Sequence, residues 1–348
     1  MDFNQTLDAA ALHASVVTID THIDIPWPTG PDAFTDAPRG KGARRVDLPK
    51  MKRGGLGAGC FAAYVPQGKR DAEGFRAAQE RALGMLDAIN AMGRTEGDVS
   101  ARVTVTADEI EAARREGVLG VIPCVENGHA IGEDLSLLAV FRGKGARYLT
   151  LTHNGHNLLA DSSNPRGDLG DGETLHGGLS GFGREAIGEL NRLGMLVDIS
   201  HVSRQAALQA AMLSKTPVVA THSCVRALCD VPRNVDDLMM DAIRDCGGMV
   251  NVTAVPSFVK KGGKFAEVTV SDFVDHLEYI VRRVGLAHAG ISSDFDGGGG
   301  FSGWEDAADS PNITAELVRR GHGVAEVTAL WGGNFLRLLR RAEEVALG

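Results

Sequence analysis

Eight short apolar segments, each separated from the next by a longer stretch, constrain the fold more than any other feature of the sequence. Most of them lack a polar face, which is typical of parallel strands covered on both sides. We predict strands over 16–20, 60–65, 118–125, 148–152, 195–200, 217–221, 249–253 and 289–293. Apolar residues at helical spacing predict helices over 71–92, 183–193, 203–213, 235–245 and 271–284, with one or two closing helices in 323–347.

The alternation of eight strands with helices favours an α/β protein with a (β/α)8 barrel over an open, doubly wound sheet. Ser203 and Ser271 stand where the N-caps of two of these helices are expected. The chain has 348 residues and contains no internal repeat, low-complexity tract or linker. We therefore expect one domain over 1–348.

Composition excludes several other classes of protein. The formal net charge of −9 argues against nucleic-acid binding, which needs clustered Lys and Arg. No run of about 18 apolar residues is present, so we expect no membrane span. The N-terminal segment has no basic region of the kind that opens a signal peptide. Five cysteines, an odd number without a C-x-x-C pair, favour a reducing compartment, and we expect a cytoplasmic protein.

Acidic or histidine side chains follow six of the eight predicted strands. The active site of such a barrel gathers at the carboxyl ends of its strands, so these side chains are expected to meet. The segments are Thr21-His22-Ile23-Asp24, Val125-Glu126-Asn127, Thr152-His153-Asn154, Ser200-His201, Thr221-His222-Ser223 and Ser293-Asp294-Phe295-Asp296.

Five of these side chains form a coherent set of metal ligands. His22 and Asp24 are two residues apart, so in an extended chain both face the same side and can bind one ion. His201 and His222 close neighbouring strands and suit a second ion, because imidazole is a ligand of zinc and similar metals. Glu126 lies between the two groups and can bridge both ions. Each residue alone has a plain structural reading, as a polar strand end or a loop carboxylate, and only the set indicates a binuclear site.

In this order, the segments resemble the membrane (renal) dipeptidases, metallopeptidases of family M19 with an amidohydrolase-like barrel. The resemblance extends over about nine-tenths of the chain. It is carried by the strand-end motifs given above and by the segments Tyr148-Leu149-Thr150-Leu151, Gly178-Leu179-Ser180-Gly181-Phe182-Gly183, Val197-Asp198-Ile199 and Pro232-Arg233-Asn234-Val235.

The resemblance implies two zinc ions per chain and a role for each site residue. Glu126 would be the bridging carboxylate, and His153 would contact the scissile carbonyl and stabilise the oxyanion. Arg233 would hold the C-terminal carboxylate of the substrate, as a planar, permanently charged fork can. Asp294 would meet the substrate amine and handle the proton of the leaving group. Arg226 is a second candidate for contact with the carboxylate.

We thus expect a zinc-dependent dipeptidase that hydrolyses free dipeptides, including L-Xaa-D-Xaa, by a metal-bridging hydroxide, and that forms a homodimer as family members often do. The main alternative is a two-metal amidohydrolase acting on another amide or ester, such as an N-acyl amino acid, a lactone or a phosphotriester. A non-catalytic binding protein would lack one of the ligands, and a metal-free isomerase or aldolase would need a lysine at a strand end. His156 and His176 lie in a long loop after the fourth strand, and the sequence leaves their roles open.

Overall fold

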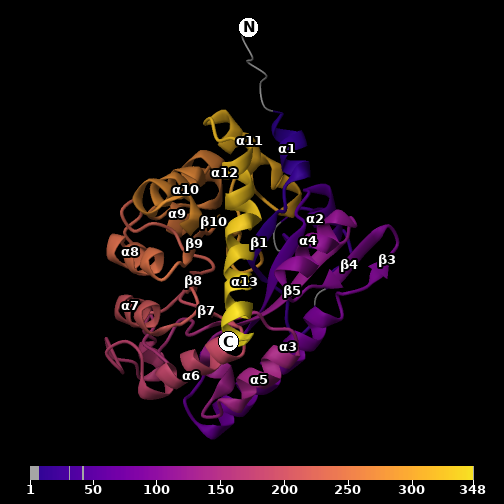
Figure 1. Cartoon of the computed structure of the whole chain (residues 1–348). Coiled ribbons are helices and arrows are strands. Elements are labelled where there is room, and N and C mark those ends of the chain that lie inside the picture. Colours follow the sequence, from indigo (N-terminus) through magenta and orange to yellow (C-terminus); the bar gives the residue numbers. More distant parts are fainter. Residues whose placement is uncertain (1–7, 31, 41–42, 348) are drawn as a thin grey trace.

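Eight parallel strands form a nearly closed barrel surrounded by helices, as predicted (Figure 1). The computed structural model describes residues 8–30, 32–40 and 43–347. Hydrogen-bonded neighbours follow one another around the barrel, and a parallel bridge between Ile23 and Phe295 brings its first and last strands together. The strands are β1 Ile19–Asp24, β2 Ala58–Tyr64, β5 Leu119–Glu126, β6 Tyr148–Thr150, β7 Leu196–Asp198, β8 Val219–Ala220, β9 Met249–Val252 and β10 Ala289–Ile291.

The first strand lies further along the chain than predicted. The apolar run at 16–20 suggested a strand there, but Val16 ends α1 (Ala9–Ser15) and β1 continues to Asp24. His22 and Asp24 therefore belong to the strand itself instead of following it. A short hairpin of β3 (Thr95–Glu96) and β4 (Val99–Val103) was also missed, and β4 pairs with β5 outside the barrel.

Five predicted helices are present, each within two residues of its expected ends. Ser203 is an N-cap as predicted, and its side chain accepts a hydrogen bond from the Ala206 N–H at 3.2 Å. Ser271 is not, because α10 begins one residue earlier and Thr269 caps it in a capping box with Asp272. The five helices are α3 Ala72–Asn90, α6 Gly181–Arg192, α7 Arg204–Leu213, α8 Asp237–Asp245 and α10 Val270–Val284.

The other helices cover the outside and one end of the barrel. They include α2 Leu48–Arg53, α4 Ala107–Arg115, α5 Ser136–Gly143, α9 Pro256–Val259, α11 Pro311–Arg319, α12 Val324–Thr328 and α13 Asn334–Leu347. A π-helical turn at Ala329–Gly333 joins α12 to α13. The predicted closing region is therefore two helices joined by this turn.

Helix α13 closes the amino-terminal end of the barrel, and Figure 1 shows it lying across the strands. Its residues Phe335, Leu338 and Leu339 share one apolar cluster with strand residues. Those strand residues include the first residues of six strands, Ile19, Ala58, Tyr148, Leu196, Val219 and Met249. Because this end is filled with apolar side chains, the opposite end is the one available for chemistry.

The described residues contain no helix that is both long and apolar enough to cross a membrane, in agreement with the sequence. The interpretation of the N-terminal segment rests partly on residues 1–7, which lie outside the part of the chain that the structure describes.

Candidate metal centre

Glu126, the last residue of β5, is at the centre of the site. It is 2% exposed, and each of its carboxylate oxygens faces different histidines. Oε2 lies 3.5 Å from Nε2 of His22. Oε1 lies 3.1 Å from Nε2 of His201, 3.4 Å from Nε2 of His222 and 4.0 Å from Nε2 of His153. Burial opposes the charge of Glu126, but attraction to His22 and the other histidines outweighs it and holds the pKa of this carboxyl well below its usual range.

Two groups of potential ligands share this carboxylate. One consists of His22, Glu126 and His222, and the other of Glu126, His153 and His201. Two metal-binding groups were predicted, but with His201 and His222 on the same ion. The geometry is compatible with this pairing, because Nε2 of His201 and Nε2 of His222 are 2.9 Å apart. It also brings His222 close to His22, with ring centroids 3.8 Å apart.

Asp24 lies beside these groups, and its surroundings fit a cation. Its Oδ1 atom is 3.8 Å from Nε2 of His22, and it is buried with no hydrogen-bond partner among the described residues. Burial, reinforced by the negative charge of Glu126, raises the pKa of Asp24 well above its usual value. A buried carboxylate oxygen without a donor is costly, and a bound cation would supply the missing partner. Imidazole nitrogens and carboxylate oxygens together suit a divalent metal of the zinc type.

A hydrogen-bond chain orients the His22 ring. Nδ1 of His22 lies 2.9 Å from the hydroxyl of Tyr148, and that hydroxyl donates to the carbonyl of Thr21 at 3.1 Å. The phenol oxygen therefore accepts from Nδ1–H, which leaves the lone pair of Nε2 pointing at the site. His222 has an equivalent arrangement, because Thr221 accepts from its Nδ1 at 2.9 Å while donating to Asp198 at 2.7 Å.

Tyr148→Phe is expected to weaken metal binding by roughly 10- to 100-fold, because it removes the acceptor that fixes the His22 ring. Competition with a chelator, followed by the metal content of the protein, measures this. Tyr279→Phe is the matched control, since the Tyr279 hydroxyl bonds to Asp237 on α8, away from the site. Equal metal retention in both variants would show that Tyr148 does not act through His22.

The site opens into a cavity of about 180 Å³. The structure brings eight of the nine predicted site residues to this region: seven line the cavity and His22 is buried behind Glu126. Five other lining residues had no predicted role. The lining residues are Asp24, Glu126, His153, Asn154, Asn164, His201, His222, Arg233, Val255, Phe258, Asp294 and Gly297.

Arg233 forms one wall of the cavity and is 5% exposed. Its terminal nitrogens donate to the hydroxyl of Ser223 at 3.3 Å and to the carbonyl of His222 at 3.0 Å. Its Nε atom is buried without a partner among the described residues, and its guanidinium carbon lies 5.2 Å from the centroid of the Phe258 ring. No carboxylate of the described residues forms an ion pair with this cation, so its charge is available to a ligand.

Asp294 faces the cavity from a turn after β10. Its φ is 56°, in the left-handed region, and burial raises the pKa of its carboxyl to about 7. Asp296 has a supporting role, because its carboxylate accepts hydrogen bonds from the backbone of Arg45 at 2.7 Å and of Val46 at 3.2 Å.

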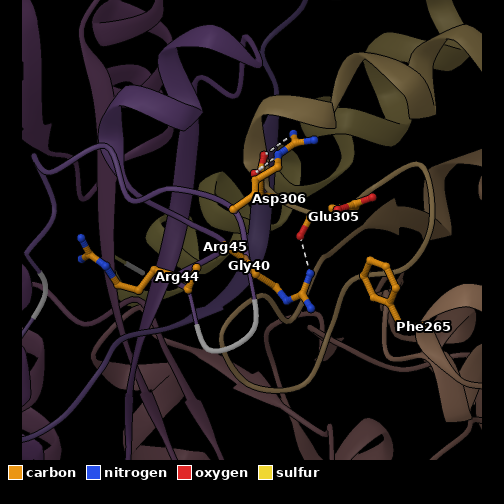
Figure 2. A pocket seen from close by; sticks show the side chains of 8 residues that line it. Gly40, Arg44, Arg45, Phe265, Glu305 and Asp306 are labelled. Carbon is orange, nitrogen blue, oxygen red and sulfur yellow. Dashed lines mark hydrogen bonds and ion pairs between the residues drawn. The ribbon is translucent and has the colours of Figure 1, made fainter.

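Figure 2 shows how the loop that carries Arg45 is fixed beside this turn. The Arg45 guanidinium donates to the carbonyl of Glu305 and lies 5.2 Å from the centroid of the Phe265 ring. A separate hollow of about 280 Å³ lies here, lined by these residues and by Arg39 and Asp306, which are ion-paired at 2.6 Å. The pairing and stacking give this hollow a structural role in holding the loop against the β10 turn.

The run of four glycines after Asp296 contains a close contact. A Cβ on Gly297 would lie 2.3 Å from Oδ1 of Asp294 and 2.5 Å from Oδ2 of Asp24. Gly297→Ala is therefore expected to push these carboxylates apart and to lower turnover by roughly 10- to 100-fold. Gly188→Ala on α6, where a Cβ meets no atom within 4 Å, is the control. Steady-state kinetics on both variants checks this, and equal activity would contradict the contact.

Arg226 lies apart from the cavity. Its side chain is 40% exposed and forms an ion pair with Asp230, with Nε 2.8 Å from Oδ1. The structure therefore does not bring Arg226 together with the other predicted site residues.

His156 and His176 bond to the backbone of the long loop after β6. Nε2 of His156 lies 3.1 Å from the carbonyl of Gly172, and Nε2 of His176 lies 2.8 Å from the carbonyl of Asn157. Neither lines the cavity, so the structure gives both a role in holding the loop that carries Asn154 and Asn164.

A parallel barrel with buried His and Glu clusters at the carboxyl ends of its strands defines a metal-dependent hydrolase of the amidohydrolase-like type. The family profile described as membrane dipeptidase (peptidase family M19) matches residues 7–348, and the chain belongs to this family. It is thus a metallo-dipeptidase, as the resemblance of its motifs implied.

Individual relatives agree with this assignment. Dipeptidase tcpJ of Claviceps purpurea is 33% identical over 309 residues, which cover 87% of this chain and 71% of that protein. The probable dipeptidase PvdM from Pseudomonas aeruginosa is 28% identical, with a TM-score of 0.89 over 97% of this chain and 98% of that one. A metallo peptidase from Rhodobacter sphaeroides, liganded with a phosphinate mimic of the dipeptide L-Ala-D-Ala, is 28% identical, with a TM-score of 0.80 over 94% of this chain and 99% of that one.

Proposed function

We propose that the protein hydrolyses free dipeptides, including L-Xaa-D-Xaa, at a centre of two zinc ions. The observation that carries this is the buried Arg233, which forms no ion pair with any described residue and lines the same small cavity as the metal-binding groups. An arginine in this position matches a substrate with a free carboxylate next to the scissile bond. The relative from Rhodobacter sphaeroides, whose ligand mimics L-Ala-D-Ala, supports the L,D stereochemistry.

The proposed ligands are His22 and Asp24 for one ion, His201 and His222 for the other, and Glu126 for both. When bound, two such ions lower the pKa of water and polarise a carbonyl oxygen. Zinc is favoured because imidazoles and carboxylates are its usual ligands in hydrolases.

Side chains of this protein bind the substrate, stabilise the oxyanion and transfer the proton. Arg233 binds and orients the substrate carboxylate. His153 points its Nε2 at the site, and burial lowers its pKa, so the ring is neutral and can donate a hydrogen bond to the oxyanion. Asp294, whose pKa lies near 7, can hold a proton at neutral pH and pass it to the departing amine.

The size of the cavity limits the substrate. A volume of about 180 Å³, lined by Arg233, Asp24 and Asp294 among others, leaves room for a short ligand only. A peptide longer than two residues would place a backbone amide where either a free carboxylate or a free amine is recognised.

A substrate panel with metal analysis on the same sample tests the proposal. It contains L-Ala-L-Ala, L-Ala-D-Ala, tri-L-alanine and N-acetyl-L-alanine. We expect turnover of the dipeptides, about two zinc ions per chain, and loss of both on His201→Ala. A fully metallated protein that leaves every dipeptide intact but cleaves N-acetyl-L-alanine would replace the dipeptide by an N-acyl amino acid as the substrate.

We also propose a cellular compartment and an oligomeric state. A reducing compartment, such as the cytoplasm, is supported by five free cysteines, of which only Cys246 is partly accessible. Kinship with the family supports a homodimer, which the sedimentation coefficient of the purified protein tests.

A further inference from the structure

A second hollow lies on the same face of the barrel, next to the active-site cavity but separate from it. Its volume is about 360 Å³, and it lies between the loop after β2, the first half of α3 and the segment after β1. No residue that lines it lines the active-site cavity. Its wall is mostly apolar and is formed by Trp27, Val65, Pro66, Ala77 and Ala78.

Arg81 supplies a positive charge at this hollow. Its Nε atom donates to the carbonyl of Tyr64 at 2.8 Å, and its guanidinium carbon lies 5.8 Å from the centroid of the Tyr64 ring. No carboxylate forms an ion pair with it in the part of the chain that the structure describes. The two terminal nitrogens of the guanidinium are therefore available as charged donors.

His129 supplies a second donor, and a chain of side-chain amides fixes its proton. Asn157 donates to Oδ1 of Asn127 at 2.9 Å, and Asn127 donates to Oε1 of Gln67 at 3.2 Å. The Gln67 amide nitrogen lies 3.2 Å from Nδ1 of His129. Because an amide nitrogen can only donate, Nδ1 accepts and the proton of the neutral ring is on Nε2.

The Nε2–H of His129 has no partner. The atom is buried and unpaired among the described residues, and burial lowers the pKa of the ring to about 4, which keeps it neutral. A Cβ on Gly68 would lie 3.3 Å from Nε2, so the glycine leaves room in front of this donor for the atom of a ligand. A buried donor without an acceptor destabilises the fold, and a ligand oxygen would supply the missing acceptor.

We propose that this hollow is a second ligand site, and that it binds a small carboxylate with an apolar or aromatic body. Both polar side chains are donors, one of them charged, so the complementary group is an anionic acceptor. The apolar wall, with the indole of Trp27, fits the body of such a ligand. A protonated amine would be repelled by the positive charge of Arg81. A neutral hydrocarbon would leave the Nε2–H of His129 without an acceptor. The proposal does not depend on the reaction catalysed at the metal centre.

The test uses the metal-loaded full chain and 3-phenylpropionate as the probe. Binding is followed by tryptophan fluorescence, because Trp27 is half-buried at the hollow while Trp304 and Trp331 are fully buried elsewhere. Calorimetry gives the stoichiometry. We expect one saturable site, with 3-phenylpropanol binding at least about tenfold more weakly because it lacks the charge. Acetate, which has the charge without the apolar body, should not produce the fluorescence change.

Two variants locate the site. Ala77→Phe fills the hollow from the exposed side of α3 and is expected to abolish binding of the probe while dipeptide hydrolysis continues. Arg81→Gln should weaken binding at least about tenfold, whereas Arg76→Gln, an exposed position on the same helix, should not. Binding that survives Ala77→Phe unchanged, or that falls equally in both arginine variants, would overturn the proposal. Failure of the wild-type chain to bind the probe at all would do the same, whatever its activity on dipeptides.

Discussion

Glu126→Gln is expected to lower dipeptide turnover by more than ~100-fold and to reduce the bound metal below two ions per chain. Loss of a residue that only supports a metal ligand typically costs 10- to 100-fold, and Glu126 is in both metal-binding groups itself. The amide keeps the size of the side chain but removes its negative charge. It also replaces one oxygen by a donor, which would face either His22 or the pair His201 and His222.

Metal content and steady-state kinetics measured on the same preparation check this result. Glu133→Gln is the matched control, because Glu133 is exposed and lies seven residues along the same segment. It should retain the metal content and the rate of the wild type. If Glu126→Gln keeps two ions and full activity, the carboxylate is not the shared ligand and the proposed centre is wrong.

Arg233→Met is expected to have the second large effect, and to act on substrate binding. Removing one partner of a buried charge interaction costs roughly 2–5 kcal/mol, or about 30- to 4000-fold in kcat/KM. The loss should come mainly from a higher KM for free dipeptides. A dipeptide amide, which has no terminal carboxylate, should be a poor substrate of the wild type and should lose little further activity in the variant.

Arg226→Met completes the comparison, because Arg226 was the other predicted contact for the carboxylate. Its exposed ion pair with Asp230 is of a kind that contributes about 1 kcal/mol or less. We expect less than about a threefold change in KM. A large effect of Arg226→Met with none from Arg233→Met would show that Arg226, and not Arg233, binds the substrate carboxylate.

The sequence predicts those strands that are buried on both faces and therefore consist mainly of apolar residues. β5 to β10 are covered on both sides, so their apolar runs mark them directly. β1 was misplaced because its second half carries the polar residues Thr21, His22 and Asp24, of which His22 and Asp24 face the site. Apolar patterning identifies a strand by its core residues and fails where functional residues replace them. The hairpin of β3 and β4 was missed for a different reason, since it is short and partly exposed.

The members of the site could be predicted, but not their arrangement. Strand ends carry the ligands in any barrel of this type, so His201 and His222 were recognisable from their positions. The distances between the histidines depend on the register and tilt of the strands. Register and tilt cannot be predicted from the residue types alone. Asn164 and Gly297 come from loops, and hydrogen bonds within those loops hold them at the cavity. Asn164 bonds to Ser162 and Asn154, and the Gly297 N–H donates to the carbonyl of Asp294.

The packing of α13 against the strands has a consequence for the folding of the nascent chain on the ribosome. The apolar cluster at the amino-terminal end of the barrel is completed by Phe335, Leu338 and Leu339, which are synthesised after all eight strands. Until they emerge, the nascent chain exposes that layer to water and remains open to aggregation or capture by chaperones. The barrel is therefore expected to complete its folding only after α13 has been made. A stop codon before 334 should yield an insoluble product, although every proposed metal ligand would already have been synthesised.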